Sequence, residues 1–354
     1  MRAKNWKSVR IAAIAAAVVC CAALLATGAR PQASGYHQVK KVVLGGEGGW
    51  DYLTADPETH RVFISRGTHV MVTDADGKIL GDIPNTAGVH GIALAQEFNR
   101  GFTSNGQASS VTIFDLKTLA TISEVKIPGQ GPDAILYDKA SKRVFTMDGR
   151  SQDATAVDAK TGEVAGTVAL GGRPETASPD GAGHVFVNLE DKSMIVEFDS
   201  NSLKVMNTWP LAPCEEPSGQ SIDVARKRLV IGCGNKMMAF MDYTNGKVVG
   251  TVPIGQGVDA NGFDPGTGFA FASCGDGTIT VAKADASGNY AVVETIQTMP
   301  RARTMAVDTS NHNVYTVTAE FGQASAPPAG SPPGARGGRA PMVPNTFTLL
   351  IYAK

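Results

Sequence analysis

One short phrase recurs seven times along this chain, at intervals of about 40 residues. Each copy begins with an acidic or turn residue, continues through a polar turn and ends in an alternating apolar strand. Clear copies read DPETHRVFIS from Asp56, DKASKRVFTM from Asp138 and DTSNHNVYTV from Asp308. Signals for three more short strands surround each copy, and several of the connecting turns open on Asp. Four short strands in every 40–50 residues or so are typical of a β-propeller blade.

The repeats account for most of the 354 residues. A prior of about 150 residues per domain would suggest two domains, but the repeats form one closed series. We therefore predict an all-β, seven-bladed β-propeller over residues 36–354, with four-stranded antiparallel blades. The last repeat lacks a fourth strand, and residues 36–44 form a strand before the first repeat. We expect that N-terminal strand to complete the last blade and close the ring, which protects the sheet edges.

Two segments of the chain are expected to lie outside the blades. Residues 1–29 carry four basic residues and no acid, then an apolar run and a small-residue end, which predicts a signal peptide. The apolar run is shorter than the roughly 20 residues that span a bilayer, so an uncleaved anchor is the second hypothesis. Residues 322–345 interrupt the last blade and are rich in Pro, Gly, Ser and Ala, which predicts disorder, with a lid over the channel as the alternative.

Composition and missing motifs narrow the function. The chain has 32 Lys+Arg and 33 Asp+Glu; without the four basic residues of the first 29, the balance is 28 against 33, or −5. That charge argues against a nucleic-acid partner. The sequence contains no haem-attachment motif, zinc-spaced Cys/His cluster, nucleophile elbow or P-loop. We expect a secreted or periplasmic monomer with no membrane span in the mature chain.

The repeat phrases resemble a known family. The patterns GxVxGTVxIGxGxD, DxxxxRVFI and VxVxDxxTGKV are similar to those of the YVTN-type, YncE-like seven-bladed propellers, which are exported bacterial proteins. The resemblance covers about residues 36–353. It implies the fold and export, and says almost nothing about chemistry, because such propellers include surface-layer, binding and uncharacterised proteins.

The first strand of each propeller blade lines the central channel. Counting five residues back from each recurring Asp, or from the equivalent position in the second blade, gives seven positions expected at the channel mouth; the fourth blade is one residue shorter. We call these residues the mouth ring: Asp51, His90, Asp133, Glu175, Ser218, Asp259 and Arg303. Loops after the second strands should reach the same face and carry further polar residues, among them Arg150, Glu190 and Asn235. The mouth is therefore predicted to be acidic, with one basic sector.

Three interpretations of the mouth ring remain open. It could hold a hard cation, Ca²⁺ or Mg²⁺, on Asp133, Glu175, Asp259 and Asn235. It could bind a cationic ligand. Alternatively, its residues are polar only because water fills the channel. No other cofactor is predicted, and no catalytic residue is assigned.

Three cysteines follow the predicted signal peptide. Cys214 precedes the first strand of the fifth blade, and Cys233 ends the second strand of that blade, so both are expected on the mouth face. We predict a disulfide between them, as an oxidising compartment allows. Cys274 occupies a similar place one blade later and is expected to be free; Cys233–Cys274 is the weaker alternative pairing.

These observations favour a non-enzymatic binding or scaffold module that takes a small molecule or protein at the channel mouth. The alternative is a metal-dependent hydrolase or lyase of the gluconolactonase kind, with a divalent cation in the channel. That alternative rests on analogy between folds, and it adds His90 to the candidate ligands. A quinoprotein dehydrogenase is a third hypothesis, weakened by the presence of only three Trp.

Overall fold

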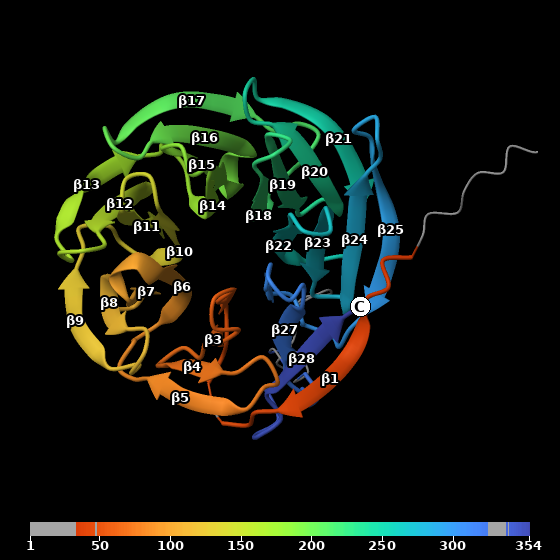
Figure 1. Ribbon diagram of the computed structural model, residues 1–354, viewed down its shortest axis with the longest axis horizontal. Coiled ribbons are helices and arrows are strands. Elements are labelled where there is room, and N and C mark those ends of the chain that lie inside the picture. The colour runs from red at the N-terminus through yellow and green to blue at the C-terminus, as the bar shows by residue number, and fades with distance from the viewer. Residues whose placement is uncertain (1–32, 47, 325–337, 339) are drawn as a thin grey trace, which may run out of the picture. The chain divides into compact units, whose positions relative to one another are not determined.

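The computed structural model describes residues 33–46, 48–324, 338 and 340–354. These residues form seven four-stranded antiparallel sheets. Figure 1 looks down the ring: the sheets are blades around a central axis, with their first strands innermost and their fourth strands at the rim. The predicted seven-bladed propeller is confirmed. The helical elements of the described chain are two 3-10 turns, η1 (Gln96–Phe98) and η2 (Glu190–Lys192).

Each blade runs outward from the axis. The first strands are β2 (Leu53–Ala55), β6 (Val89–Ala95), β10 (Pro132–Asp138), β14 (Pro174–Pro179), β18 (Pro217–Asp223), β22 (Val258–Asp264) and β26 (Met305–Val307). The second strands are β3 (Val62–Ser65), β7 (Arg100–Asn105), β11 (Arg143–Asp148), β15 (His184–Leu189), β19 (Arg228–Cys233), β23 (Phe269–Cys274) and β27 (Val314–Thr318). The third strands are β4 (Val70–Thr73), β8 (Ser110–Asp115), β12 (Asp153–Asp158), β16 (Met194–Asp199), β20 (Met237–Asp242), β24 (Thr278–Ala284) and β28 (Thr348–Ala353). The fourth strands are β5 (Ile79–Ile83), β9 (Thr121–Lys126), β13 (Val164–Ala169), β17 (Lys204–Pro210), β21 (Lys247–Pro253), β25 (Tyr290–Gln297) and β1 (His37–Val43).

The core lies between neighbouring blades. Second and third strands are buried along nearly their whole length, whereas fourth strands are largely exposed. Phe145 of β11 and Phe198 of β16 meet across one blade interface with ring centroids 5.2 Å apart. At another blade interface, the ring centroids of Phe63 in β3 and Phe114 in β8 lie 5.9 Å apart. Each such buried side chain contributes about 1.5–3 kcal/mol of hydrophobic free energy, so blade-to-blade packing stabilises the ring.

The ring closes as predicted. β1 pairs with β28, from His37 opposite Ala353 to Val43 opposite Thr348. Just before β1, Tyr36 packs edge-on against Phe271 of the neighbouring blade, with centroids 5.2 Å apart. The N-terminal strand therefore joins the last blade and is also anchored to the blade before it.

The recurring Asp of the repeat phrase is structural. Asp56, Asp138, Asp264 and Asp308 are fully buried. The Asp308 carboxylate accepts the backbone N–H of Ser310 at 2.9 Å and also contacts the Nδ1 of His60, in the next blade, at 2.8 Å. Each such Asp fixes the turn between the first and second strands, which explains its repetition.

Neither segment expected outside the blades is fully described. The predicted signal peptide, 1–29, lies outside the described residues. The described ends of the predicted insert, 322–345, pair with each other and with the segment before them: Gly322 donates to the Pro341 carbonyl at 2.9 Å, and Val343 to the Glu320 carbonyl at 2.8 Å. Its middle, 325–337 and 339, is outside the described residues. Within the described residues, no helix has the length and apolar character to span a membrane.

Candidate functional site

The mouth ring is built on a repeated β-bulge. Pairing between the first and second strands shifts register after Val89, Pro132, Pro174, Pro217 and Val258. The residue directly after each of these five is the ring residue of that blade: His90, Asp133, Glu175, Ser218 and Asp259. A bulge releases a residue from the ladder and re-aims its side chain. In the first and last blades, Asp51 and Arg303 instead precede short first strands.

Three ring residues from consecutive blades converge on one side of the mouth. The Nδ1 of His90 lies 2.6 Å from Asp51 Oδ2 and 3.4 Å from Asp133 Oδ1. One ligand atom from each of the three residues falls within 4.8 Å of the others, which suits a single metal ion. The hydrogen bond that the His90 ring donates to the Asp51 carboxylate raises the pKa of His90, although partial burial opposes the shift. This side therefore holds a histidine that favours its charged form between two carboxylates.

The opposite side is an ion pair between neighbouring blades. Arg303 Nη1 lies 2.6 Å from Asp259 Oδ1. Asp259 is 9% exposed, and its other oxygen, Oδ2, is buried without a hydrogen-bond partner among the described residues. Burial raises the pKa of Asp259 to about 7, although Arg303 opposes the shift. Arg303 therefore neutralises one acid of the ring.

Tyr52 bridges the mouth and was not predicted. Its hydroxyl, from the first blade, donates to Glu175 Oε1 of the fourth blade at 3.2 Å, so the contact crosses the channel. Burial, followed by the negative charges of Asp133, Glu190 and Asp259, raises the pKa of Glu175 to about 8. Burial, opposed by His90, raises the pKa of Asp133 to about 6. Carboxyl groups that share a confined space cannot all ionise without an energetic penalty.

A signal for Tyr52 was present in the sequence. In the other six blades the residue after the ring position is small: Gly91, Ala134, Thr176, Gly219, Ala260 and Thr304. Neighbouring first strands come close near the axis, and a Cβ on Gly219 would lie 2.6 Å from the carbonyl carbon of Ala260. A single large side chain in this set therefore indicates a residue that fills the channel.

Glu190 contributes charge to the mouth without belonging to the ring. It begins η2, after the second strand of the fourth blade, and forms an ion pair with Arg173. Its charge helps to raise the pKa values of Glu175 and Asp133. The sequence analysis placed Glu190 on this face but not among the interacting acids. Its effect on the pKa values of Glu175 and Asp133 depends on its distance from their strands, which the sequence does not show.

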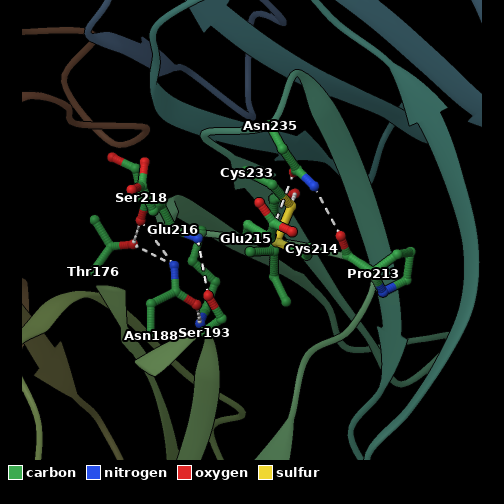
Figure 2. The surroundings of a disulfide bond; sticks show 12 residues. Thr176, Asn188, Ser193, Pro213, Cys214, Glu215, Glu216, Ser218, Cys233 and Asn235 are labelled. Carbon is green, nitrogen blue, oxygen red and sulfur yellow. Dashed lines mark hydrogen bonds between the residues drawn. A yellow bond between two sulfur atoms is a disulfide. The ribbon is translucent and has the colours of Figure 1, made fainter. Parts of the chain in front are cut away.

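Ring positions are held by side chains of the preceding blade. Ser104 of β7 donates to the Asp133 carbonyl, and Ser273 of β23 donates to the Arg303 carbonyl. Asn188 of β15 donates to the Ser218 carbonyl at 2.8 Å (Figure 2). These contacts fix the backbone at the mouth before any ligand arrives, which reduces the ordering cost of binding.

Cavities lie on the side of the mouth ring formed by His90 and Asp133 and along the first strands. One of about 380 Å³ has a rim that includes His90, Asp133, Arg150 and Arg173. Another of about 130 Å³ lies deeper along the first strands, lined by Tyr52, Thr54, Ile92, Leu136, Thr176 and Gln220 among others. The deeper one has room for a few waters, each needing about 30 Å³. The mouth can therefore take a small ligand above Tyr52.

Asn235 is not brought into the ring. Its amide donates to the Pro213 carbonyl at 2.8 Å and accepts the Glu215 N–H at 3.3 Å (Figure 2). The nitrogen and the oxygen of the Asn235 side-chain amide thus both stabilise the loop before β18. Ser218 lies at the bulge of its blade, where its backbone carbonyl accepts hydrogen bonds from Thr176 and Asn188.

The cysteines pair as predicted. A disulfide joins Cys214 to Cys233, with their Cα atoms 5.4 Å apart. Cys274 is free and buried, and burial raises the pKa of its thiol to about 12. The disulfide is compatible with an exported protein, because such bonds persist in oxidising compartments.

Comparisons with known proteins establish the fold alone. No family model and no curated protein sequence matches this chain. A Kuenenia stuttgartiensis hydrazine synthase structure aligns with a TM-score of 0.66 at 14% identity, over 76% of this chain and 92% of that one. A chain of a mitotic checkpoint complex aligns with a TM-score of 0.68 at 14% identity, over 88% of this chain and 96% of that one. The resemblance to YVTN-type propellers is thus supported at the level of fold, and membership of that family stays a prediction.

Proposed function

We propose that this protein is an exported binding module whose channel mouth takes a small cationic ligand. The observation that carries the proposal is the convergence of Asp133, Glu175 and Asp259 in a setting that raises their pKa values to about 6, 8 and 7. A positive charge among them would favour their ionised forms and relieve their mutual repulsion. β-Propellers commonly serve as binding or scaffold modules, and a protein partner could supply the same charge on a lysine side chain.

The size and the walls of the mouth favour a compact ligand. Tyr52 closes the channel below the ring, and the Arg303–Asp259 pair occupies one side. His90 and Asp133 lie on the rim of the 380 Å³ cavity, which has room for a compact ligand. An organic ammonium group fits these contacts, since carboxylates accept its N–H donors in charge-assisted hydrogen bonds.

The pH dependence of binding follows from the raised pKa values. Putrescine, a small diamine, is expected to bind at least tenfold more tightly at pH 8 than at pH 6, because binding requires carboxylates that are partly protonated at pH 6. A double variant, Asp133→Asn with Glu175→Gln, should weaken binding at pH 8 at least tenfold. Isothermal titration calorimetry measures both effects.

A matched control for these variants is Glu124→Gln. Glu124 is an exposed acid on β9 at the rim, so its loss should leave putrescine affinity unchanged. Absence of binding at pH 8, or binding that neither pH nor the double variant changes, would contradict the proposal.

A second candidate is a metal-dependent hydrolase or lyase, favoured by the compact group of Asp51, His90 and Asp133. Imidazole with two carboxylates suits Mn²⁺ or Zn²⁺ better than Ca²⁺, so the predicted Ca²⁺ or Mg²⁺ and the predicted ligand Asn235 fit this geometry less well. Tight Mn²⁺ binding that His90→Ala abolishes, together with lactone hydrolysis and no putrescine binding, would favour this candidate over the first.

A further inference from the structure

A separate pocket of about 730 Å³ opens on the mouth face beside the ring. Its walls come from three parts of the chain: the loop before the first blade with Gly48, Gly49 and Trp50, the loop before β26 with Arg301 and Arg303, and the two ends of the insert with Phe321 and Met342. Gly275 completes the lining. Small-molecule sites commonly occupy about 300–1,000 Å³, so the pocket has a suitable size.

The apolar wall of this pocket is aromatic. The ring centroid of Trp50 lies 6.1 Å from that of Phe321 and 5.4 Å from that of Phe347. Trp50 and Phe321 are only half-buried, whereas Phe347 is fully buried beneath them. Two partly exposed rings over a buried one offer a surface on which a planar ring can stack.

Arg66 holds two glycines of the segment before Trp50. Arg66 is fully buried, its guanidinium lies 3.6 Å from the Phe347 ring centroid, and it donates to the carbonyls of Gly45 and Gly48 at 3.1 and 3.3 Å. Gly48 has a φ of +94°, and a Cβ there would lie 2.9 Å from the Arg66 carbonyl oxygen. A glycine is therefore required at this position, and the aromatic wall is preformed.

The charged residues in the described lining of the pocket are arginines. The Arg301 guanidinium lies 3.7 Å from the Phe321 ring centroid, and Arg301 forms no ion pair with any described carboxylate. Arg303 belongs both to this lining and to the mouth ring, and its charge is paired with Asp259. None of the described lining residues is acidic. The sign of the charge is thus opposite to that of the mouth ring.

We propose that this pocket binds an aromatic carboxylate. The planar ring would stack on Trp50 and Phe321, and the carboxylate would accept N–H donors from Arg301, whose fork matches a carboxylate in size and geometry. The ligand differs in chemistry from the cation proposed for the mouth ring, and the two proposals stand independently.

The test uses 2-naphthoate as the probe and isothermal titration calorimetry as the measurement. Wild-type protein should bind 2-naphthoate at least tenfold more tightly than the neutral 2-naphthamide, because only the acid pairs with Arg301. It should also bind 2-naphthoate at least tenfold more tightly than cyclohexanecarboxylate, because only the former has a planar ring to stack. Arg301→Gln should remove most of the preference for acid over amide.

Two control variants distinguish binding at this pocket from general charge effects and from binding at the mouth ring. Arg226→Gln, which removes an exposed arginine paired with Asp223 on another part of the ring, should leave 2-naphthoate affinity unchanged. Asp133→Asn should also leave it unchanged, even if it abolishes cation binding at the mouth. Equal affinity for acid and amide, no loss in Arg301→Gln protein that circular dichroism shows to be folded, or no binding at millimolar 2-naphthoate would overturn the proposal.

Discussion

Replacing both Cys214 and Cys233 with alanine is expected to lower the free energy of unfolding by about 3 kcal/mol. The disulfide joins residues 19 positions apart. Without it, the unfolded chain regains the conformational entropy that the closed loop had removed. Because both cysteines are almost fully buried, lost side-chain packing adds to the effect.

The loop before β18 should become more mobile in this double variant without leaving the blade. Gly234 still donates to the Glu215 carbonyl at 2.8 Å, and Asn235 still holds Pro213. Ser218 remains tied to the fourth blade through Asn188. We therefore expect a folded propeller with faster amide hydrogen exchange in this loop.

Urea unfolding measures the predicted loss, with Cys274→Ala as the matched control. Cys274 is equally buried but unpaired, so its replacement should cost only a packing term of about 1 kcal/mol. Denatured, unreduced wild-type protein lacking residues 1–29 should show one reactive thiol. Three reactive thiols, or equal stability of the double variant and the control, would show that the bond does not form.

Replacing Glu175 with glutamine is expected to stabilise the protein at high pH, by about 4–5 kcal/mol at pH 9. The pKa of Glu175 rises from 4.5 to about 8 on folding. The folded protein therefore holds a proton that the unfolded chain releases at lower pH, and the stability linked to this proton is lost as pH rises from about 4.5 through 8. Glutamine cannot ionise, and its amide oxygen can still accept the Tyr52 hydroxyl, so the variant avoids this loss.

The measurement is the free energy of unfolding of wild type and Glu175→Gln at pH 5 and pH 9. The difference between the two proteins should be small at pH 5 and largest at pH 9. Glu58→Gln, which changes an exposed acid in a turn, should track wild type throughout. Parallel pH profiles for wild type and Glu175→Gln would contradict the burial and repulsion assigned to this carboxyl.

The fold could be predicted in detail because its signals are local and repeated. The alternating apolar residues that follow each recurring Asp became the second strands, and the Asp fixed the turn, as at Asp308. The missing strand of the last blade had one candidate partner, residues 36–44, and β1 occupies it. The described pairing at the ends of the insert was not foreseen, because composition alone carries no information on which backbone groups meet.

The site could be predicted only in part. Counting along the repeat placed seven residues at the mouth, since a propeller brings equivalent positions to one face. The count did not show that bulges aim these side chains, that His90 lies between Asp51 and Asp133, or that Tyr52 reaches Glu175. It also assigned Asn235 to a metal, whereas its amide is engaged in its own loop.

The sequence by itself determined the number of blades, the closure of the ring and the disulfide pair. Each of these follows from periodicity, from spacing along one blade or from residue type, and none depends on distances between blades. Tertiary structure alone decided which acids pair with which bases, which carboxyls gain raised pKa values, and where Trp50, Phe321 and Arg301 form a second pocket of opposite charge. Electrostatic and stacking interactions change over one or two ångströms, and those separations arise only when strands far apart in the chain are packed around one axis.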